Sequence, residues 1–207
     1  MEKTKRKEME FQVRRSEILT AAEKIFASKG FYNSTMAEIA NASGFAIGTL
    51  YQFFEGKENL YTTMVSEKLD KMYAEIRQSV NREAAIFNKL EELVRSHFRF
   101  VENNVDFCNL LIRGEGATLS KGETALRDKI IADHLNHIGY VEYMMRWGTQ
   151  TEAFKIMEPR VMAYALLGII RSFIYGWMLT AQDTSLCDKV ECVLDIFLNG
   201  VRAGVSK

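Results

Sequence analysis

The sequence predicts an all-α protein, and three observations support this. The 207 residues include a single proline, whereas all-β sandwiches and barrels usually place more prolines in their turns. Apolar residues recur at helical spacing along most of the chain, and no segment alternates with the period of two that marks a strand. Glycines cut the chain into short pieces before residue 60, and the pieces after residue 60 are long.

Composition limits the classes of protein to which the chain can belong. Hydrophobic residues make up 47% and charged residues 26%, which excludes a disordered chain. The 27 basic residues balance the 27 acidic ones, which excludes a uniformly basic nucleic-acid binder but leaves room for a local basic face. Three cysteines are too few and too scattered for a disulfide framework, and they fit a reducing compartment.

No targeting or membrane-spanning segment is expected. The N-terminal residues contain no apolar core of the kind that a signal peptide needs. The most apolar stretch runs from Val161 to Leu179, but Arg171 interrupts it, and a membrane span needs about 20 nearly uninterrupted apolar residues. We therefore interpret this stretch as a buried helix and predict a cytoplasmic protein without a membrane partner.

The predicted elements begin with a flexible basic leader over residues 1–13 and a helix over residues 14–29. In this helix Ile18 and Ala22 lie on the same face as the apolar residues that follow them. Gly30 stands where a left-handed C-cap belongs, so the helix is expected to end there.

Two short helices follow the first one. Thr35 and Glu38 have the spacing of a capping box, which opens a helix that runs to residue 42. Gly44 then breaks the chain, and a second short helix spans about residues 46–54. Two short helices joined by a tight glycine turn are the signature of a helix-turn-helix, whose second helix fits the major groove of DNA.

Longer helices are expected in the rest of the chain. One opens at Lys57 and runs into the seventies, and a capping sequence at Ser185 precedes the last one. The last helix carries a strict apolar stripe over residues 190–201. The other expected helices cover residues 84–104, 106–113, 123–147 and a stretch that begins with Pro159, with a glycine-rich loop over 114–122.

The N-terminal region also contains an ordered set of motifs. They read Ile18-Leu19-x-Ala21-Ala22-x-x-Ile25-Phe26, Gly30-Phe31, Thr35-x-x-Glu38-Ile39-Ala40, Ala42-x-Gly44, Gly48-Thr49-Leu50-Tyr51-x-x-Phe54 and Lys57-Glu58-x-Leu60. In this order and spacing, residues 14–60 resemble the DNA-binding domain of TetR-family transcriptional regulators. The resemblance implies a helix-turn-helix domain over 14–60 and a larger helical domain for ligand binding and dimerisation over 61–207.

The same resemblance implies which residues contact DNA. By position, Thr35, Tyr51 and Lys57 contact the phosphate backbone, and Gly48 lets the second short helix approach the duplex. The residues implied to face base edges are Ala46, Ile47, Thr49 and Gln52, while Phe53 stands where the family often has a polar ring. Lysine neutralises phosphate, glutamine pairs with adenine, and alanine or threonine contacts a thymine methyl. Because this helix carries no arginine, we expect a half-site that leans towards A and T.

An aromatic and methionine stripe in the C-terminal region allows two interpretations. A plain helix core explains such a stripe. The other interpretation is the wall of an apolar ligand cavity, since aromatic and methionine side chains often line such sites. On that interpretation the ligand-binding residues are Phe107, Leu111, Tyr140, Tyr143, Met144, Trp147, Phe173 and Trp177.

The resemblance further implies the assembly and the function. The apolar segments 158–181 and 186–203 resemble the helix pair that forms the family's two-fold interface, although burial in a single core would also explain them. We therefore expect a homodimeric, sequence-specific regulator of transcription that needs no cofactor. The expected mechanism is repression, relieved when a small and largely apolar effector removes the protein from a near-palindromic operator. Activation is the alternative.

Two rival classes are an enzyme and a helical carrier that does not bind DNA. The chain contains no G-x-S-x-G, G-x-x-x-x-G-K-[ST] or H-E-x-x-H motif, so an enzyme is not expected. His134 and His137 are three residues apart with Asp133 beside them, and this spacing can hold a metal ion. Packed or hydrogen-bonded helix histidines explain the spacing as well, so no metal is expected.

Overall fold

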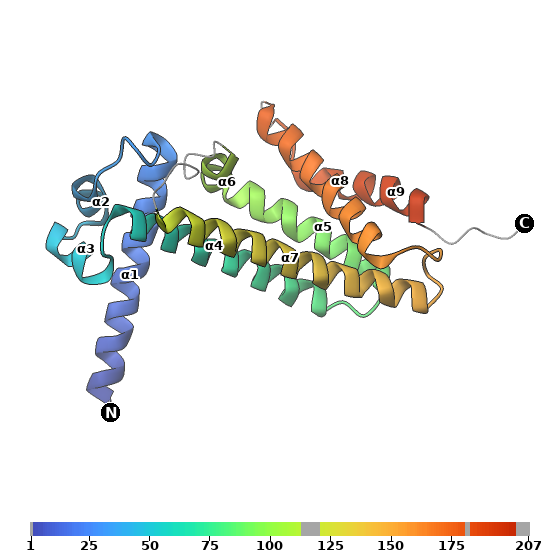
Figure 1. Ribbon diagram of the computed structural model, residues 1–207, viewed down its shortest axis with the longest axis horizontal. Coiled ribbons are helices and arrows are strands. Elements are labelled where there is room, and N and C mark those ends of the chain that lie inside the picture. The colour runs from blue at the N-terminus through green and yellow to red at the C-terminus, as the bar shows by residue number, and fades with distance from the viewer. Residues whose placement is uncertain (1, 113–120, 181–182, 202–207) are drawn as a thin grey trace, which may run out of the picture. The chain divides into compact units, whose positions relative to one another are not determined.

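The structure, a computed structural model, describes residues 2–112, 121–180 and 183–201, and these residues form helices without any strand (Figure 1). The all-α prediction is therefore confirmed for this part of the chain. The helices are α1 (Glu2–Lys29), α2 (Met36–Ser43), α3 (Ile47–Phe53), α4 (Lys57–Asn81), α5 (Ile86–Asn103), α6 (Val105–Ile112), α7 (Lys121–Gln150), α8 (Pro159–Leu179), the short 3₁₀ helix η1 (Leu186–Lys189) and α9 (Val190–Val201).

The chain divides into two compact units. Unit 1 comprises residues 1–68 and 106–129, and unit 2 comprises residues 69–105 and 130–207. The division lies inside α4, further along the chain than the boundary that we placed after residue 60. The expected loop over 114–122 lies mostly outside the described residues, and α7 already begins at Lys121.

In unit 1, α1 packs on α2 through the face that the sequence indicated. The side chains of Ile18, Ala22 and Phe26 are fully buried there. Gly30 has a φ of 78°, and its N–H donates to the carbonyl oxygen of Phe26 at 2.8 Å. Because glycine adopts this left-handed conformation without a steric penalty, the helix ends where we expected.

The start of α1 differs from the prediction. We expected a flexible leader over residues 1–13, but α1 already begins at Glu2 (Figure 1). Pairs of side chains four residues apart support the helix here: Arg6 Nε donates to Glu10 at 3.0 Å, and Gln12 donates to Glu8 at 2.9 Å. Each such pair stabilises an exposed helix by about 0.2–0.5 kcal/mol.

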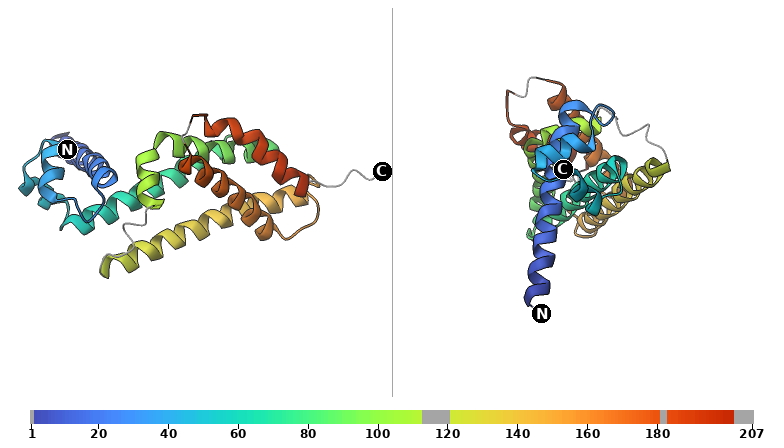
Figure 2. Two further views of the ribbon diagram at one scale, coloured as in Figure 1. Left: turned by 90° about the horizontal axis from the view of Figure 1, so that it is seen from above. Right: turned by 90° about the vertical axis from the view of Figure 1, so that its left-hand side faces the viewer.

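Unit 2 is organised around α5, whose face of Leu90, Leu93, Val94 and Phe98 is fully buried. α9 packs against both α5 and α8 (Figure 2). At the start of η1 the carboxylate of Glu102, on α5, accepts hydrogen bonds from the Ser185 hydroxyl at 2.7 Å and the Leu186 N–H at 2.5 Å.

Helix α8 is less covered than predicted. Its length and composition would allow a membrane span, as those of the core helices of soluble proteins also can. Of its most apolar window, 33% is buried within this chain. We expected a buried helix, whereas within this chain Val161, Tyr164 and Tyr175 are nearly half exposed and Leu179 is 78% exposed.

Candidate functional site

The helix-turn-helix begins with the capping box that the sequence predicted. Thr35 is the N-cap of α2, and its hydroxyl accepts the Glu38 N–H at 3.2 Å, while the Thr35 N–H donates to the Glu38 carboxylate at 2.9 Å. Lys29 and the Thr35 hydroxyl also donate to the Glu38 carboxylate. The hydrogen bonds that this carboxylate accepts from Lys29 foremost, and from the hydroxyl and N–H of Thr35, lower the pKa of the carboxyl. The visible role of Thr35 is to start α2, and its contact with phosphate stays a prediction.

Gly44 forms the corner between the two short helices. Its φ is 75°, in the left-handed region that glycine adopts most easily. The N–H groups of Gly44 and Phe45 donate to the carbonyl oxygens of Asn41 and Ala40 at 3.2 and 3.0 Å. These two bonds close α2, and the chain then enters α3 three residues after the corner.

α3 presents most of its surface to solvent. Leu50 is fully buried and holds the helix to unit 1, while Gln52 is exposed and Ile47 and Tyr51 are 44% and 54% exposed. Ala46 is the N-cap of α3, and its side chain makes no hydrogen bond to the helix. The first N–H groups of α3 are therefore not capped by the side chain at the N-cap position. Of the residues predicted to face bases or phosphates, those from Ile47 to Phe53 thus lie on an accessible helix, and their contacts with DNA stay predictions.

Gly48 has a different role from Gly44. It lies inside α3, and a Cβ at this position would meet nothing within 4 Å. The fold of this chain therefore does not need a glycine there, and alanine would favour the helix by about 1 kcal/mol. A surface that comes close to the backbone of α3 would explain the glycine, as the predicted approach to DNA requires.

Lys57, which we expected to contact phosphate, is already engaged within unit 1. Its ammonium donates to the carbonyl oxygens of Phe31 at 2.7 Å and Ser34 at 2.8 Å. It also lies 4.4 Å from the centre of the Phe31 ring. Burial lowers the pKa of Lys57, against the opposing effect of Glu38. Lys57 thus fixes the turn between α1 and α2, and its contact with phosphate is a prediction that competes with these bonds.

Phe53, expected at the DNA surface, is partly covered by the start of α1. The rings of Phe11 and Phe53 lie 4.4 Å apart between their centres. The apolar ring at position 53 therefore has a packing partner that the sequence did not reveal, because Phe11 fell within the presumed flexible leader.

The residues predicted to line a ligand cavity are divided between the two units, and their contact with a ligand stays a prediction. Phe107 and Leu111 belong to unit 1, and the other six lie on α7 and α8 in unit 2. On α7, Met144 is buried whereas its neighbour Tyr143 is 71% exposed. The stripe predicted from helical spacing therefore includes one side chain on the outer surface. Spacing alone did not define which face of α7 points inward.

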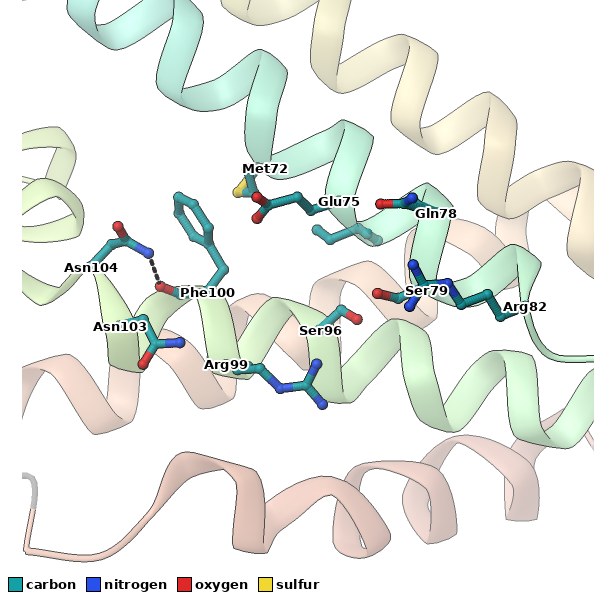
Figure 3. Close-up of a pocket in the computed structure, with 11 residues that line it drawn as sticks. Met72, Glu75, Gln78, Ser79, Arg82, Ser96, Arg99, Phe100, Asn103 and Asn104 are labelled. Atoms are coloured by element: carbon teal, nitrogen blue, oxygen red, sulfur yellow. Dashed lines mark hydrogen bonds between the residues drawn. The ribbon is translucent and has the colours of Figure 1, made fainter. Parts of the chain in front are cut away.

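A pocket of about 220 Å³ lies between α4 and α5 in unit 2 (Figure 3). None of the eight predicted ligand-binding residues lines it. The residues of the two helices that face the same space are Met72, Glu75, Ile76, Gln78, Ser79, Arg82, Ser96, Arg99, Phe100, Asn103 and Asn104. The lining is mostly polar and includes two arginines, so it suits a polar or anionic group better than an alkyl chain.

A second polar cluster lies between α4, α5 and α7. His137 Nε2 and His97 Nε2 are 3.1 Å apart, and the centres of the Tyr73 and His137 rings are 4.8 Å apart. The side chain of Arg77 lies over the ring of Tyr140 at 5.6 Å. The sequence did not indicate that His97 and His137 meet, because partners on different helices leave no signal in spacing. No group of three metal-ligating side chains occurs among the described residues.

Taken together, an accessible α3 behind a glycine corner, attached to a larger helical unit, defines a helix-turn-helix DNA-binding regulator. Comparison with known proteins agrees. Residues 18–64 match the tetR family of bacterial regulatory proteins, and residues 65–200 match the C-terminal region of YsiA-like protein. The chain belongs to the TetR family of transcriptional regulators.

Individual relatives refine this picture. The fatty acid metabolism regulator protein of Bacillus subtilis (strain 168) is 23% identical over 186 residues, which cover 89% of this chain and 94% of that protein. The repressor KstR2 of Mycobacterium tuberculosis (strain ATCC 25618 / H37Rv) is 31% identical over 44% of this chain and 46% of its own. The crystal structure of FadR from Bacillus subtilis in complex with stearoyl-CoA has a TM-score of 0.74 at 22% identity, over 89% of this chain and 98% of that one.

Proposed function

We propose that the protein is a homodimeric repressor that leaves a near-palindromic operator when an acyl thioester binds unit 2. The observation that carries the DNA-binding part is α3 itself. It is exposed along the residues that the family uses for reading, and it holds a glycine that the fold does not require. In a two-fold dimer the two α3 helices would enter successive major grooves about 34–36 Å apart.

Selection of DNA fragments by the purified protein tests this part. We expect enrichment of one inverted repeat, and binding to it that weakens steeply as salt rises, because phosphate contacts release counterions. Gln52→Ala should relax the preference at one base pair by about 1–3 kcal/mol. Equal recovery of all fragments would contradict sequence-specific binding. A reporter gene placed behind the selected site then distinguishes repression from activation.

The uncovered face of α8 and α9 supports the homodimer. Val161, Tyr164 and Tyr175 on α8 and Ile196 on α9 are each about half exposed, and clustered apolar side chains of this kind mark protein interfaces. A Cβ at Gly168 or Gly176 would meet nothing within 4 Å in this chain, which leaves room for a second helix to cross closely.

Sedimentation equilibrium tests the dimer. We expect Val161→Glu and Ile196→Glu to shift the protein towards monomer, because a charge would be buried in the interface. Ile156→Glu is the matched control, since Ile156 is 95% exposed and lies outside both helices. A wild-type monomer, or equal effects of all three variants, would contradict the proposed interface.

The relatives support an acyl thioester as effector. A fatty acid metabolism regulator aligns along most of this chain, and a structural neighbour is described with stearoyl-CoA bound. The polar pocket offers Arg82 and Arg99 for the phosphates of such a ligand, and arginine suits phosphate because it donates in a planar fork.

Release of operator DNA by stearoyl-CoA, coenzyme A and stearate tests the effector class. We expect release by stearoyl-CoA alone at equal concentrations. Exchange of both Arg82 and Arg99 for alanine should weaken the response to the thioester. Release by stearate as strong as that by stearoyl-CoA would instead assign recognition to the alkyl chain and its carboxylate.

A further inference from the structure

The histidine pair in unit 2 has a fixed pattern of protons. His97 Nδ1 lies 2.6 Å from the carbonyl oxygen of Leu93. A carbonyl oxygen can only accept, so His97 Nδ1 carries a proton. Burial lowers the pKa of His97, so its ring is neutral and Nε2 holds a lone pair. That lone pair accepts the proton on His137 Nε2, 3.1 Å away.

This chain of bonds leaves one acceptor of His137 without a donor. Burial foremost, and the electrostatic cost of adding a positive charge beside His97, Arg77 and His134, lowers the pKa of His137 to about 2. The ring is therefore neutral, and since Nε2 carries its proton, Nδ1 holds a lone pair. His137 is 1% exposed, and among the described residues nothing donates to Nδ1.

Arg77 has an unpaired hydrogen-bond donor in the same cluster. Its Nε–H group is buried and has no acceptor in the described part of the chain. Arg77 lies close enough to His137 to lower the pKa of that ring, and the ring of Tyr140 lies beside both side chains. Buried polar groups are nearly always paired in folded proteins, so an unpaired acceptor and an unpaired donor in one cluster call for a partner.

We propose that His137 Nδ1 and Arg77 Nε bind an uncharged group of the effector that both donates and accepts a hydrogen bond, namely a hydroxyl or a carboxamide. The carbonyl of Leu93 fixes the tautomers of both histidines, so His137 can only accept. A carboxylate, an ester or an ether, which cannot donate, would face a lone pair there. The inference rests on the proposed effector class, because the pantetheine arm of an acyl-CoA carries amides and a hydroxyl.

Because His137 Nδ1 and Arg77 Nε are buried, a ligand can bind them only if the helices around them move. Both are sealed from solvent in this structure, so a ligand reaches them only when α4 and α7 separate at this level. Arg77 lies on α4, which is one continuous helix from Lys57 to Asn81. A ligand that forms hydrogen bonds with His137 Nδ1 and Arg77 Nε therefore binds the conformation with a displaced α4 more tightly than the conformation described here. Such a difference in affinity between two conformations is what allows a ligand to switch a protein.

Imidazole ¹⁵N NMR of the full-length protein tests the site with dodecan-1-ol, dodecanamide, methyl laurate, laurate and stearoyl-CoA as probes. Without a probe, we expect His137 Nδ1 to show the shift of an unprotonated nitrogen that accepts no hydrogen bond. The alcohol, the amide and stearoyl-CoA should move that resonance towards a hydrogen-bonded acceptor, whereas the ester and the carboxylate should not.

Affinity measurements on variants provide the second readout. His137→Phe and Arg77→Met should each weaken the alcohol and the amide about tenfold or more, since each leaves a buried polar group of the ligand unpaired. Affinity for methyl laurate should stay the same. His134→Phe is the matched control, because His134 lies on the same helix and contacts Arg171 instead, at 3.1 Å.

The outcomes separate this inference from the proposed function. If His137 Nδ1 is protonated or already hydrogen-bonded without a probe, as a buried water would cause, the inference is wrong. Release of DNA by stearoyl-CoA without a shift at Nδ1 also overturns the inference and leaves the effector class standing. Binding of the alcohol and the amide with the expected shift, but no response to stearoyl-CoA, supports the site and refutes the thioester. If no probe binds, both fail.

Discussion

The two units of this protein differ in how far apart in the sequence their functional residues lie. In unit 1, the capping box at Thr35, the corner at Gly44 and the open position at Gly48 all lie within one short segment, and each depends on near neighbours. In unit 2, the pocket draws on both α4 and α5, and the histidine pair joins residues 40 positions apart. A site whose residues are neighbours in the sequence can be predicted from sequence motifs, whereas a site formed by the packing of distant helices cannot.

The largest expected effect concerns a glycine in unit 2 that the sequence did not single out. Gly148 on α7 is buried, and a Cβ there would overlap the buried ring of Phe154. Gly148→Ala should lower the free energy of unfolding by about 1–3 kcal/mol, because overpacked cores must shift side chains or backbone. Urea denaturation measures this. Gly139→Ala on the same helix, where nothing lies within 4 Å, should be neutral or stabilising, and equal losses in both variants would refute the packing argument.

The next prediction tests whether the start of η1 in unit 2 is stabilised by a residue that is distant in the sequence. Glu102 accepts bonds from Ser185 and from the backbone of Leu186 and Cys187. Glu102→Ala should lower the free energy of unfolding by about 1–3 kcal/mol, since it removes hydrogen bonds to a charged acceptor and leaves the part-buried N–H of Leu186 unpaired. Thermal denaturation checks this value.

The pH dependence of the same contact has a defined sign. Burial would raise the pKa of Glu102, but the hydrogen bonds from Ser185, Cys187 and Leu186 outweigh it and lower the pKa below the ordinary 4.5. The unfolded chain therefore binds the proton more readily, so the stabilisation is complete above about pH 4.5 and is lost as the pH falls through the folded value. Glu102→Gln should flatten this part of the pH–stability curve, and an unchanged curve would remove Glu102 from the account.

A smaller effect tests whether unit 1 is as local as it looks. The ring contact between Phe11 and Phe53 joins the start of α1 to α3, and aromatic pairs couple by about 0.5–1.5 kcal/mol. A double-mutant cycle with Phe11→Ala and Phe53→Ala should give a coupling near the lower end of that range, because Phe11 is 43% exposed. Strictly additive effects on stability would mean that the first turns of α1 do not brace α3.

The same contrast explains how far the sequence could be interpreted. Caps and glycines gave the helices close to their observed bounds, and Pro159 marked the start of α8 as expected. The leader was misjudged because its alternating charges were read as solvated coil rather than as pairs such as Arg6 with Glu10. Lys57 was assigned to phosphate by the family resemblance, and its carbonyl partners in the turn after α1 become visible only in three dimensions.

The ligand-binding region shows the limit most clearly. Helical spacing put Tyr143 and Met144 on one stripe, although the packing of α7 turns one outward and buries the other. Arg77 carried no signal in the sequence, and His137 was noted only for its spacing from His134. The unpaired hydrogen-bonding atoms of these two side chains appear only in the folded, buried cluster.

Operator affinity of the Gly48→Ala variant, measured alongside its thermal stability, tests the central claim that α3 is the DNA-reading surface. The added methyl group has open space in this chain and favours the helix by up to about 1 kcal/mol. We expect the melting temperature to hold or rise while affinity for the selected operator falls about tenfold or more, equivalent to 1.4 kcal/mol. Full operator affinity in this variant would show that nothing approaches α3 closely at that position and would contradict the account.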